Sequence, residues 1–536
     1  MAEDSLPTLP RDIHFGDAGV RGIARGVALL ARLTGAAYGP HGGRVMLERA
    51  FDTPLHATDA ERICRDFALD DPLADIGVRL VRELQLRTRR AAGDGGATAT
   101  LLFDALLRDG LRLLAGGAEP RVLAAGLAAG ARDADRLLQA QARPVRGAAA
   151  RRVLALGIAG DPLLGDLLAA AVAAAGRDGV VLVEASRARS SGVVQETGFR
   201  LQAGYASPLM ATDTLRLQTC LAAPEIFVAL DRIDGRDMVL PLLERATARA
   251  RPALLVAPAV EGAALATLAA NAARRDAPAA VVAVVLPGHG AGREEQLHDL
   301  SAATGARPIA AARDLASADA GALDAMAGSA GEALVGKVAS VIRGGRADPL
   351  LLRLRLRTID EACAGWPTEH EREQLQRRRG NLTGRTVLLQ VGGDTDPESG
   401  ERLQRAEAAL RGYAGALRAG VLPGAGAALL RVAAALPAGP GGDRADPGRA
   451  MLRRALSHPS ARLLVNAGVP QPLRAAILDR WAASRGAIVL PAGGAERGNV
   501  PPASAAAQRA GLQAAATMAA MLLTASVVVT DRRNPG

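Results

Sequence analysis

The sequence predicts a multidomain α/β protein in which mainly helical regions at both ends of the chain flank a central α/β region. The chain has 536 residues, 49% of them hydrophobic, which is enough to build several cores. Near both ends apolar residues recur at helical spacing, whereas in the middle short β-branched runs alternate with helical stretches. Because such alternation is typical of a mainly parallel sheet covered by helices, the middle is expected to form a separate domain.

The first region is expected to be mostly helical. Apolar spacing predicts a helix over residues 20–37, which Gly39-Pro40 ends, and residues 44–48 have the composition of a short strand. Further helices are expected over residues 75–90, 98–115 and 120–142.

The composition changes after Pro144, where strands are expected. The predicted strands are residues 179–184, 226–230, 253–256, 280–285 and 386–391. Helices are expected over 368–379 and 401–418, and alanine-rich helices return after Gly424. Residues 526–529 again have the pattern of a strand, so the two ends are expected to fold together with the middle inserted between them.

The composition argues against nucleic-acid binding. The net charge is +10, but the basic residues are almost all arginine, Lys337 being the only lysine, and they are scattered among acidic residues. Aromatic residues for base stacking make up only 2% of the chain. Cys64, Cys220 and Cys363 lie far apart, which predicts neither a zinc site nor a disulfide framework and favours a cytoplasmic location.

Targeting and membrane segments are not expected. The acidic N-terminus has no apolar core of the kind found in secretory signals. The most apolar stretch, residues 510–529, is interrupted by Gln513, Thr517 and Thr524, so no membrane span is predicted.

The strongest local motif is the small-residue turn of residues 93–100, Gly-Asp-Gly-Gly-Ala-Thr-Ala-Thr, which leads into an apolar helix. A turn without bulky side chains lets several backbone N–H groups converge on a phosphate at a helix N-terminus, and Asp94 beside them could hold a metal ion. The turn is therefore a candidate nucleotide site, although a glycine-rich helix start alone would explain it equally well.

Two weaker motifs do not predict a binding site. Residues 331–338, Gly-Glu-Ala-Leu-Val-Gly-Lys-Val, nearly match a P-loop, but Val338 replaces the hydroxyl residue that binds magnesium and the context is strand-like. His289 and His298 have no Glu or Cys at metal-ligand spacing and are expected to lie on the surface.

Two further turns, Tyr38-Gly39-Pro40 and residues 420–426, combine with the Asp94 turn into an ordered set. In this order the elements resemble those of the GroEL-type (group I) chaperonins, the 60 kDa chaperonin family, in a divergent form. Further matches run along nearly the whole chain. They are Phe15-Gly16, Asp59 before Arg65-Asp66, and residues 204–208, 260–268, 371–376 and 529–531.

The resemblance implies a chaperonin subunit with three domains. The helical equatorial domain would comprise residues 1–142 and 419–536, the hinge-like intermediate domain residues 143–196 and 386–418, and the α/β apical, substrate-binding domain residues 197–385. Such a subunit binds non-native polypeptides in the cytoplasm and assembles into a homo-oligomeric ring. Ring size, a second ring, a small co-chaperonin and the clients are left open by the sequence.

The resemblance also implies a site for ATP and Mg²⁺. Its ATP-binding residues would be Tyr38, Gly39, Pro40, Asp94, Gly95, Gly96, Ala97, Thr98, Gly424 and Ala425. Asp94 matches the magnesium-holding aspartate, and Asp59 is a second acidic residue of the catalytic site.

Several positions depart from the family pattern. The water-activating aspartate aligns with Ala408, and since Glu407 is rotated by about 100° on a helix it is not a direct substitute. The aspartate near the adenine aligns with Ala503, and His41 replaces a lysine. ATP binding is therefore expected with weakened hydrolysis, and the resemblance favours an enzyme, a protein-folding ATPase of the isomerase class.

The apical groove keeps apolar residues at the family's substrate-binding positions. They are Leu209, Met210, Leu240, Leu243 and Leu265, while Ala269 and Ala270 replace larger residues. Leu240 and Leu243 share a helix face, which simple core packing would explain as well. The alternative function is an ATPase-deficient paralogue that acts as a holdase, a scaffold or a partner in mixed rings.

Overall fold

The computed structural model describes residues 11–531 except 50–51, 58, 66, 177–178, 187, 214, 275–279, 289, 366–368, 439–441, 443–445 and 485–501. The chain divides into two compact units. Unit 1 consists of residues 1–169 and 404–536, and unit 2 is the continuous stretch 170–403.

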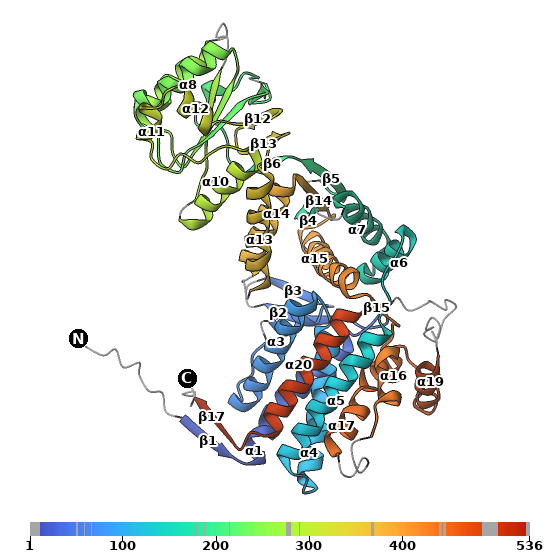
Figure 1. Ribbon diagram of the computed structural model, residues 1–536. Coiled ribbons are helices and arrows are strands. Elements are labelled where there is room, and N and C mark those ends of the chain that lie inside the picture. The colour runs from blue at the N-terminus through green and yellow to red at the C-terminus, as the bar shows by residue number, and fades with distance from the viewer. Residues whose placement is uncertain are drawn as a thin grey trace, which may run out of the picture. The chain divides into compact units, whose positions relative to one another are not determined.

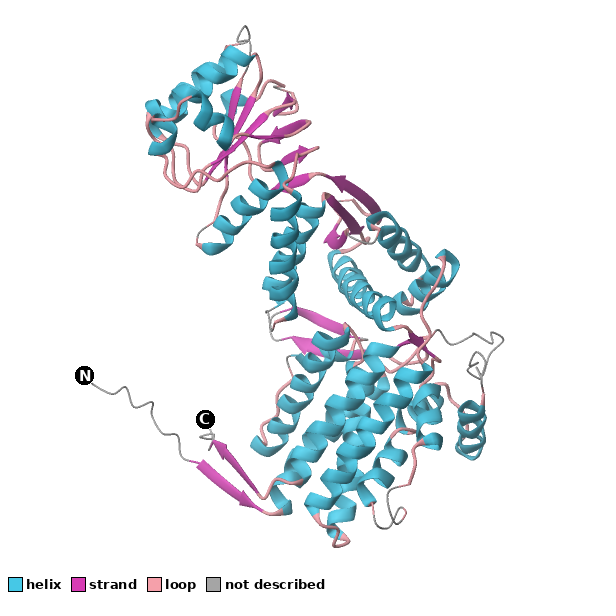
Figure 2. Ribbon diagram, viewed as in Figure 1, coloured by secondary structure: helices cyan, strands magenta, loops and turns pink. Residues whose placement is uncertain are grey.

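Unit 1 is mainly helical (Figures 1 and 2). Its longer helices in the first segment are α1 (Asp17–Ala36), α3 (Pro72–Ala92), α4 (Gly96–Ala115) and α5 (Pro120–Gln141), with α2 (Ala60–Arg65) and α6 (Ala148–Ala159). Its second segment adds α16 (Ala427–Ala435), α17 (Pro447–Ala455), α18 (His458–Asn466), α19 (Gln471–Ala483) and α20 (Ala505–Leu523). The helices α7 (Pro162–Ala175) and α15 (Asp396–Ala419) cross the unit boundaries.

The two segments of unit 1 share one core. The C-terminal helix α20 packs against α3, α4 and α5, and buries Leu512 and Met518 with Phe103 and Leu127 of the first segment. The outermost strands β1 (Arg11–Phe15) and β17 (Val527–Asp531) pair antiparallel, Arg11 opposite Asp531. The expectation that the two ends fold together is confirmed.

Short sheets complete unit 1. The hairpin β2 (Val45–Arg49) and β3 (Asp52–Ala57) follows the first turn, and β15 (Val421–Leu422) pairs with β16 (Ala503–Ser504). No helix among the described residues is long and apolar enough to cross a membrane.

Unit 2 contains the predicted parallel sheet. Strands β8 (Glu225–Val228), β9 (Ala253–Ala257) and β10 (Val281–Val285) run parallel, and β11 (Gly328–Ser329) joins β8 antiparallel. Their nearly continuous apolar runs are buried because helices cover the sheet. The helices that follow these strands are α8 (Arg236–Arg249), α9 (Gly262–Ala273), α10 (Ala291–Thr304), α11 (Arg313–Ala316) and α12 (Ala320–Met326).

A second sheet in unit 2 is antiparallel, in the order β6 (Phe199–Leu201), β13 (Ser340–Arg343), β12 (Glu332–Gly336), β7 (Gln218–Ala222). The near-P-loop therefore forms strand β12 and the turn into β13, where Lys337 is exposed, and no helix follows it. This agrees with the strand-like context expected from the sequence.

A third sheet has the order β4 (Val180–Ala185), β14 (Arg385–Val391), β5 (Gly192–Thr197). The central strand β14 pairs parallel with β4 and antiparallel with β5. Helices α13 (Pro349–Ala364) and α14 (Glu369–Thr383) pack against each other, and α14 also lies on β4 and β14.

Candidate functional site

The Gly93–Thr98 turn connects α3 to α4 within unit 1. Gly93 ends α3 in the left-handed conformation, and Gly95, with φ 103°, caps α4. The first bond inside α4 runs from the Ala99 N–H to the Gly95 carbonyl at 2.9 Å. The N–H groups of residues 96–98 precede that bond, which is the arrangement that binds phosphate at a helix N-terminus.

Close packing explains why glycine occupies both positions. A Cβ on Gly95 would lie 2.8 Å from the carbonyl oxygen of Ala507 in α20, and one on Gly93 would lie 2.5 Å from that of Arg411 in α15. The turn is thus held between a helix of the C-terminal segment and α15, and its shape depends on residues that lie more than 300 positions later.

The predicted Tyr38-Gly39-Pro40 turn lies beside the turn of residues 93–98. The Tyr38 hydroxyl is 2.9 Å from Thr98 Oγ1 in the first turn of α4, and burial raises the pKa of Tyr38. Asn466 Nδ2 donates to the Tyr38 carbonyl at 2.8 Å. Gly39 has φ 82° and packs so closely on Leu463 that a Cβ would lie 2.1 Å from it. The Tyr38 side chain therefore reaches the first turn of α4, and Gly39 follows it directly in the chain.

The two predicted carboxylates, Asp59 and Asp94, are close enough to interact electrostatically. Asp94 is exposed, and its Oδ1 accepts a 2.6 Å bond from the Gly95 N–H. The pKa of Asp59 is raised, first by desolvation and then by the negative charges of Glu61 and Asp94, and Arg411 opposes the increase. No cluster of three or more potential metal ligands occurs among the described residues. Two carboxylates with phosphate oxygens and water are nevertheless a set that suits Mg²⁺.

Helix α15 places residues 408, 411 and 412 on the face toward Asp94. A Cβ on Gly412 would lie 3.4 Å from the Asp94 Cβ, and Ala408 is one turn earlier on the same face. The Glu407 carboxylate lies 3.9 Å from the Arg411 guanidinium. In this part of the structure position 408 carries a methyl group instead of an acid, and Arg411 brings positive charge near Asp59. Sequence reasoning missed Arg411, although its i+3 spacing from Ala408 could have indicated it.

The predicted turn of residues 420–426 packs against Leu463, as Gly39 of the Tyr38-Gly39-Pro40 turn also does. Ala425, with φ 56°, is buried in a cluster with Leu463 and Trp481, and Tyr38 packs against that cluster. Ser460 Oγ donates to the Ala425 carbonyl at 2.8 Å. Ala503 lies opposite Leu422 in the β15–β16 pair, and Leu422 is two residues before Gly424. Tyr38 and Ala425 thus belong to one cluster of unit 1.

The predicted apolar groove residues of unit 2 differ in exposure. Leu209, in the short 3₁₀ turn Pro208–Met210, is 60% exposed, whereas Leu240, Leu243 and Leu265 on α8 and α9 are half-buried. Met210 corrects the expectation, because it is only 1% exposed and lies in the core, where its sulfur accepts the Ala283 N–H. Adjacent residues in a tight turn point in different directions, so Met210 is not part of an exposed surface.

The chain is similar to known proteins over most of its length. Residues 30–533 match the model of the TCP-1/cpn60 chaperonin family. Two solved structures of chaperonin gp146 from the bacteriophage EL 2 (Pseudomonas aeruginosa), both in the presence of ATP-BeFx, are similar over nearly the whole chain. The first has a TM-score of 0.64 at 18% identity, covering 97% of this chain and 99% of gp146. The second has a TM-score of 0.57 at 19% identity, covering 98% and 100%. At this identity the likeness shows a shared fold, and the family match over most of the chain shows that this protein belongs to the TCP-1/cpn60 chaperonin family.

Proposed function

We propose that this protein binds non-native polypeptides and assists their folding, and that it changes conformation through Mg-ATP binding with weakened hydrolysis. Membership of the chaperonin family supports the chaperone role itself. The nucleotide part rests on one observation above all, the convergence of Tyr38, Gly39 and the Asp94 turn at the N-terminus of α4.

The residues present fit a magnesium nucleotide. Backbone N–H groups of residues 96–98 would hold phosphate oxygens, and the Tyr38-Gly39-Pro40 turn would lie beside them. Asp94 would hold Mg²⁺, with Asp59 nearby as a second carboxylate. The cation would neutralise phosphate charge, which also offsets the mutual repulsion of these two carboxylates. The gp146 structures, in the presence of ATP-BeFx, support the same reading for this fold.

Weakened hydrolysis follows from helix α15. A general base typically contributes about 10²–10⁴-fold to a proton-transfer step. Position 408 faces the Asp94 turn without a carboxylate, and Glu407 lies beside Arg411 on the neighbouring side of the helix. Slow turnover is therefore expected, driven by positioning and charge neutralisation.

Client binding would use the apolar residues that remain accessible, Leu209 with the half-buried Leu240, Leu243 and Leu265. Hydrophobic contact is non-directional and so suits unrelated polypeptides. We further expect a homo-oligomeric ring, and a cytoplasmic location fits the free cysteines Cys64, Cys220 and Cys363.

The alternative is an ATPase-deficient paralogue that acts as a holdase, a scaffold or a partner in mixed rings. Alanine at both 408 and 503 favours it, because two acidic positions of the family's site are lost together.

The decisive experiment measures ATP affinity and single-turnover hydrolysis with and without Mg²⁺. The proposal predicts magnesium-dependent ATP binding that Asp94→Asn weakens roughly tenfold or more. Asp109→Asn, on the far part of α4 beside Arg454, is the matched control and should bind as the parent does. Binding with no detectable turnover would favour the paralogue, and absence of ATP binding in the folded parent protein would refute the proposal.

A further inference from the structure

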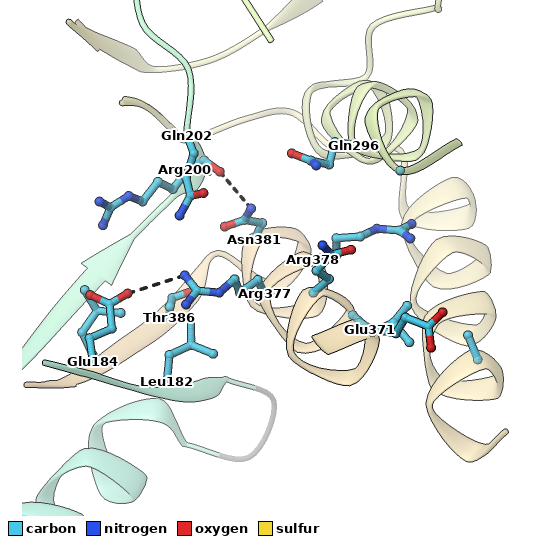
Figure 3. Close-up of a pocket in the computed structure, with 15 residues that line it drawn as sticks. Leu182, Glu184, Arg200, Gln202, Gln296, Glu371, Arg377, Arg378, Asn381 and Thr386 are labelled. Carbon is cyan, nitrogen blue, oxygen red and sulfur yellow. Dashed lines mark hydrogen bonds and ion pairs between the residues drawn. The ribbon is translucent and has the colours of Figure 1, made fainter. Parts of the chain in front are cut away.

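Unit 2 contains a partly open cavity of about 510 Å³, whose lining residues lie between positions 182 and 388. Its walls come from strands β4, β14 and β6 and from helices α10, α13 and α14 (Figure 3). This volume lies in the range of cavities that take small organic ligands. Nothing in the proposed chaperone cycle uses it.

The floor of the cavity follows from strand alternation. Leu182 and Glu184 are two apart on β4, and Thr386 and Leu388 are two apart on β14, so all four point to one face of the parallel pair. Leu182 lies opposite Leu388 in the register. Together with Leu375 of α14 they give the cavity an apolar base.

Ion pairs fix one wall in place. Arg378 Nε donates to Asp299 Oδ2 at 2.6 Å, and its Nη2 donates to Glu295 Oε2 at 2.8 Å. Arg355 of α13 binds the same two carboxylates, and the Asp299 side chain is almost fully buried. Helices α10, α13 and α14 are therefore tied together, which makes the wall preformed.

Two further contacts close the opposite side. Asn381 Nδ2 donates to the Arg200 carbonyl at 2.8 Å and joins α14 to β6, while Arg377 Nη1 lies 3.5 Å from Glu184 Oε1 and joins α14 to β4 (Figure 3). The Arg377–Glu184 pair is long and partly exposed, so it holds the two elements only weakly. An anion of better geometry could replace Glu184 as the partner of Arg377.

The polar lining is rich in hydrogen-bond donors. Three arginines, 200, 377 and 378, and two glutamates, 184 and 371, line the cavity, and Arg378 is already engaged by Asp299 and Glu295. Side-chain amides of Gln202, Gln296, Gln374 and Asn381 also line the cavity. Guanidinium and amide groups beside an apolar base are complementary to a molecule with an apolar body and one acidic group.

From this geometry we propose that the cavity is a binding site for a small organic carboxylate whose apolar body rests on Leu182 and Leu388 and whose acid group engages Arg377. The ligand displaces Glu184 from Arg377 and bridges α14 to the β4–β14 pair. This inference is independent of nucleotide binding in unit 1.

The test uses 4-phenylbutyrate and its uncharged amide, 4-phenylbutyramide, titrated into the full-length protein by calorimetry. A probe of about a dozen non-hydrogen atoms should bind in the millimolar range, and the carboxylate should bind roughly tenfold tighter than the amide. Arg377→Gln should weaken carboxylate binding roughly tenfold, whereas Glu184→Gln should tighten it by removing a competing and repelling charge.

The control is Arg379→Gln, because Arg379 lies on the same helix but pairs with Asp360 outside the cavity. Its carboxylate affinity should match that of the parent. Thermal melting verifies that each variant is folded, and Glu184→Gln keeps the test decisive if Arg377→Gln does not fold. Equal affinity for carboxylate and amide, no binding of either probe, or weaker binding in Glu184→Gln would overturn the proposal.

Discussion

The hydroxyl of Tyr38 lies 2.9 Å from that of Thr98, and this contact joins the end of the first helical segment to the first turn of α4. Tyr38 also packs against the cluster of Ala425, Leu463 and Trp481. One side chain therefore connects α4 with two of the turns of the proposed nucleotide site. Tyr38 thus contacts both the start of α4 and the cluster that contains Ala425.

A double-mutant cycle measures this coupling. Tyr38→Phe and Thr98→Val each remove one side of the hydrogen bond, and the double variant should be less destabilised than the sum by about 1 kcal/mol. Urea unfolding of the four proteins provides the free energies. Strict additivity of the changes in unfolding free energy would show that the two hydroxyls do not stabilise the fold through their contact.

Asp59→Asn should stabilise the protein without nucleotide at neutral pH. The folded-state pKa of Asp59 is raised above its ordinary value of 3.8, so the ionised carboxylate opposes folding at pH 7 and protonation relieves it as the pH falls. The melting temperature should rise in the variant at pH 7, and this gain should shrink as the pH approaches 3.8. Glu61→Gln is the contrast, since Glu61 pairs with Arg65 and Arg89 and its loss should bring no gain. A gain that stayed constant with pH would contradict the electrostatic explanation.

Ala408→Asp should raise ATP hydrolysis by about 10²-fold or more, because it restores a carboxylate on the α15 face that approaches Asp94. Ala414→Asp places the same group on the exposed side of that helix and should leave turnover unchanged. Single-turnover phosphate release is the measurement. Equal rates for both variants and the parent would show that a carboxylate at position 408 does not activate the water that attacks ATP.

Leu209→Asp and Met210→Ala should separate client binding from stability. Leu209 is exposed, so its substitution should leave the unfolding free energy nearly unchanged while reducing the protection of a chemically denatured enzyme that aggregates on dilution. Met210 is buried, and its truncation should cost about 2–5 kcal/mol. Full protection by Leu209→Asp would remove Leu209 from the client surface.

The sequence predicted the elements with strong periodicity and the positions that require glycine. Helices α1, α3, α4 and α5 and strands β8, β9 and β10 begin and end within a few residues of their expected bounds. Gly39, Gly93 and Gly95 all have positive φ, which is why those turns were recognisable in the sequence.

Other features depend on contacts that no local pattern encodes. The antiparallel sheet of β6, β7, β12 and β13 was not predicted, because its strands are short. In addition, β7 pairs with β12, which lies more than 100 residues later in the chain. The opposite exposures of Leu209 and Met210 arise within one tight turn. The role of Arg411 beside Asp59 and the unit 2 cavity both result from helix packing against distant segments.

The pairing of β1 with β17 also sets an order of events during synthesis. Unit 2 is a continuous stretch and can fold while the chain is still on the ribosome, whereas α3, α4 and α5 must wait for α20 to cover their shared core. At about 5–20 residues per second, the interval between completion of α5 at Gln141 and arrival of α20 at Ala505 is roughly 20–70 s. Through that interval the nascent N-terminal helices expose apolar surface of the kind that aggregates. The two-segment core of unit 1 therefore makes burial of these helices dependent on completion of the chain.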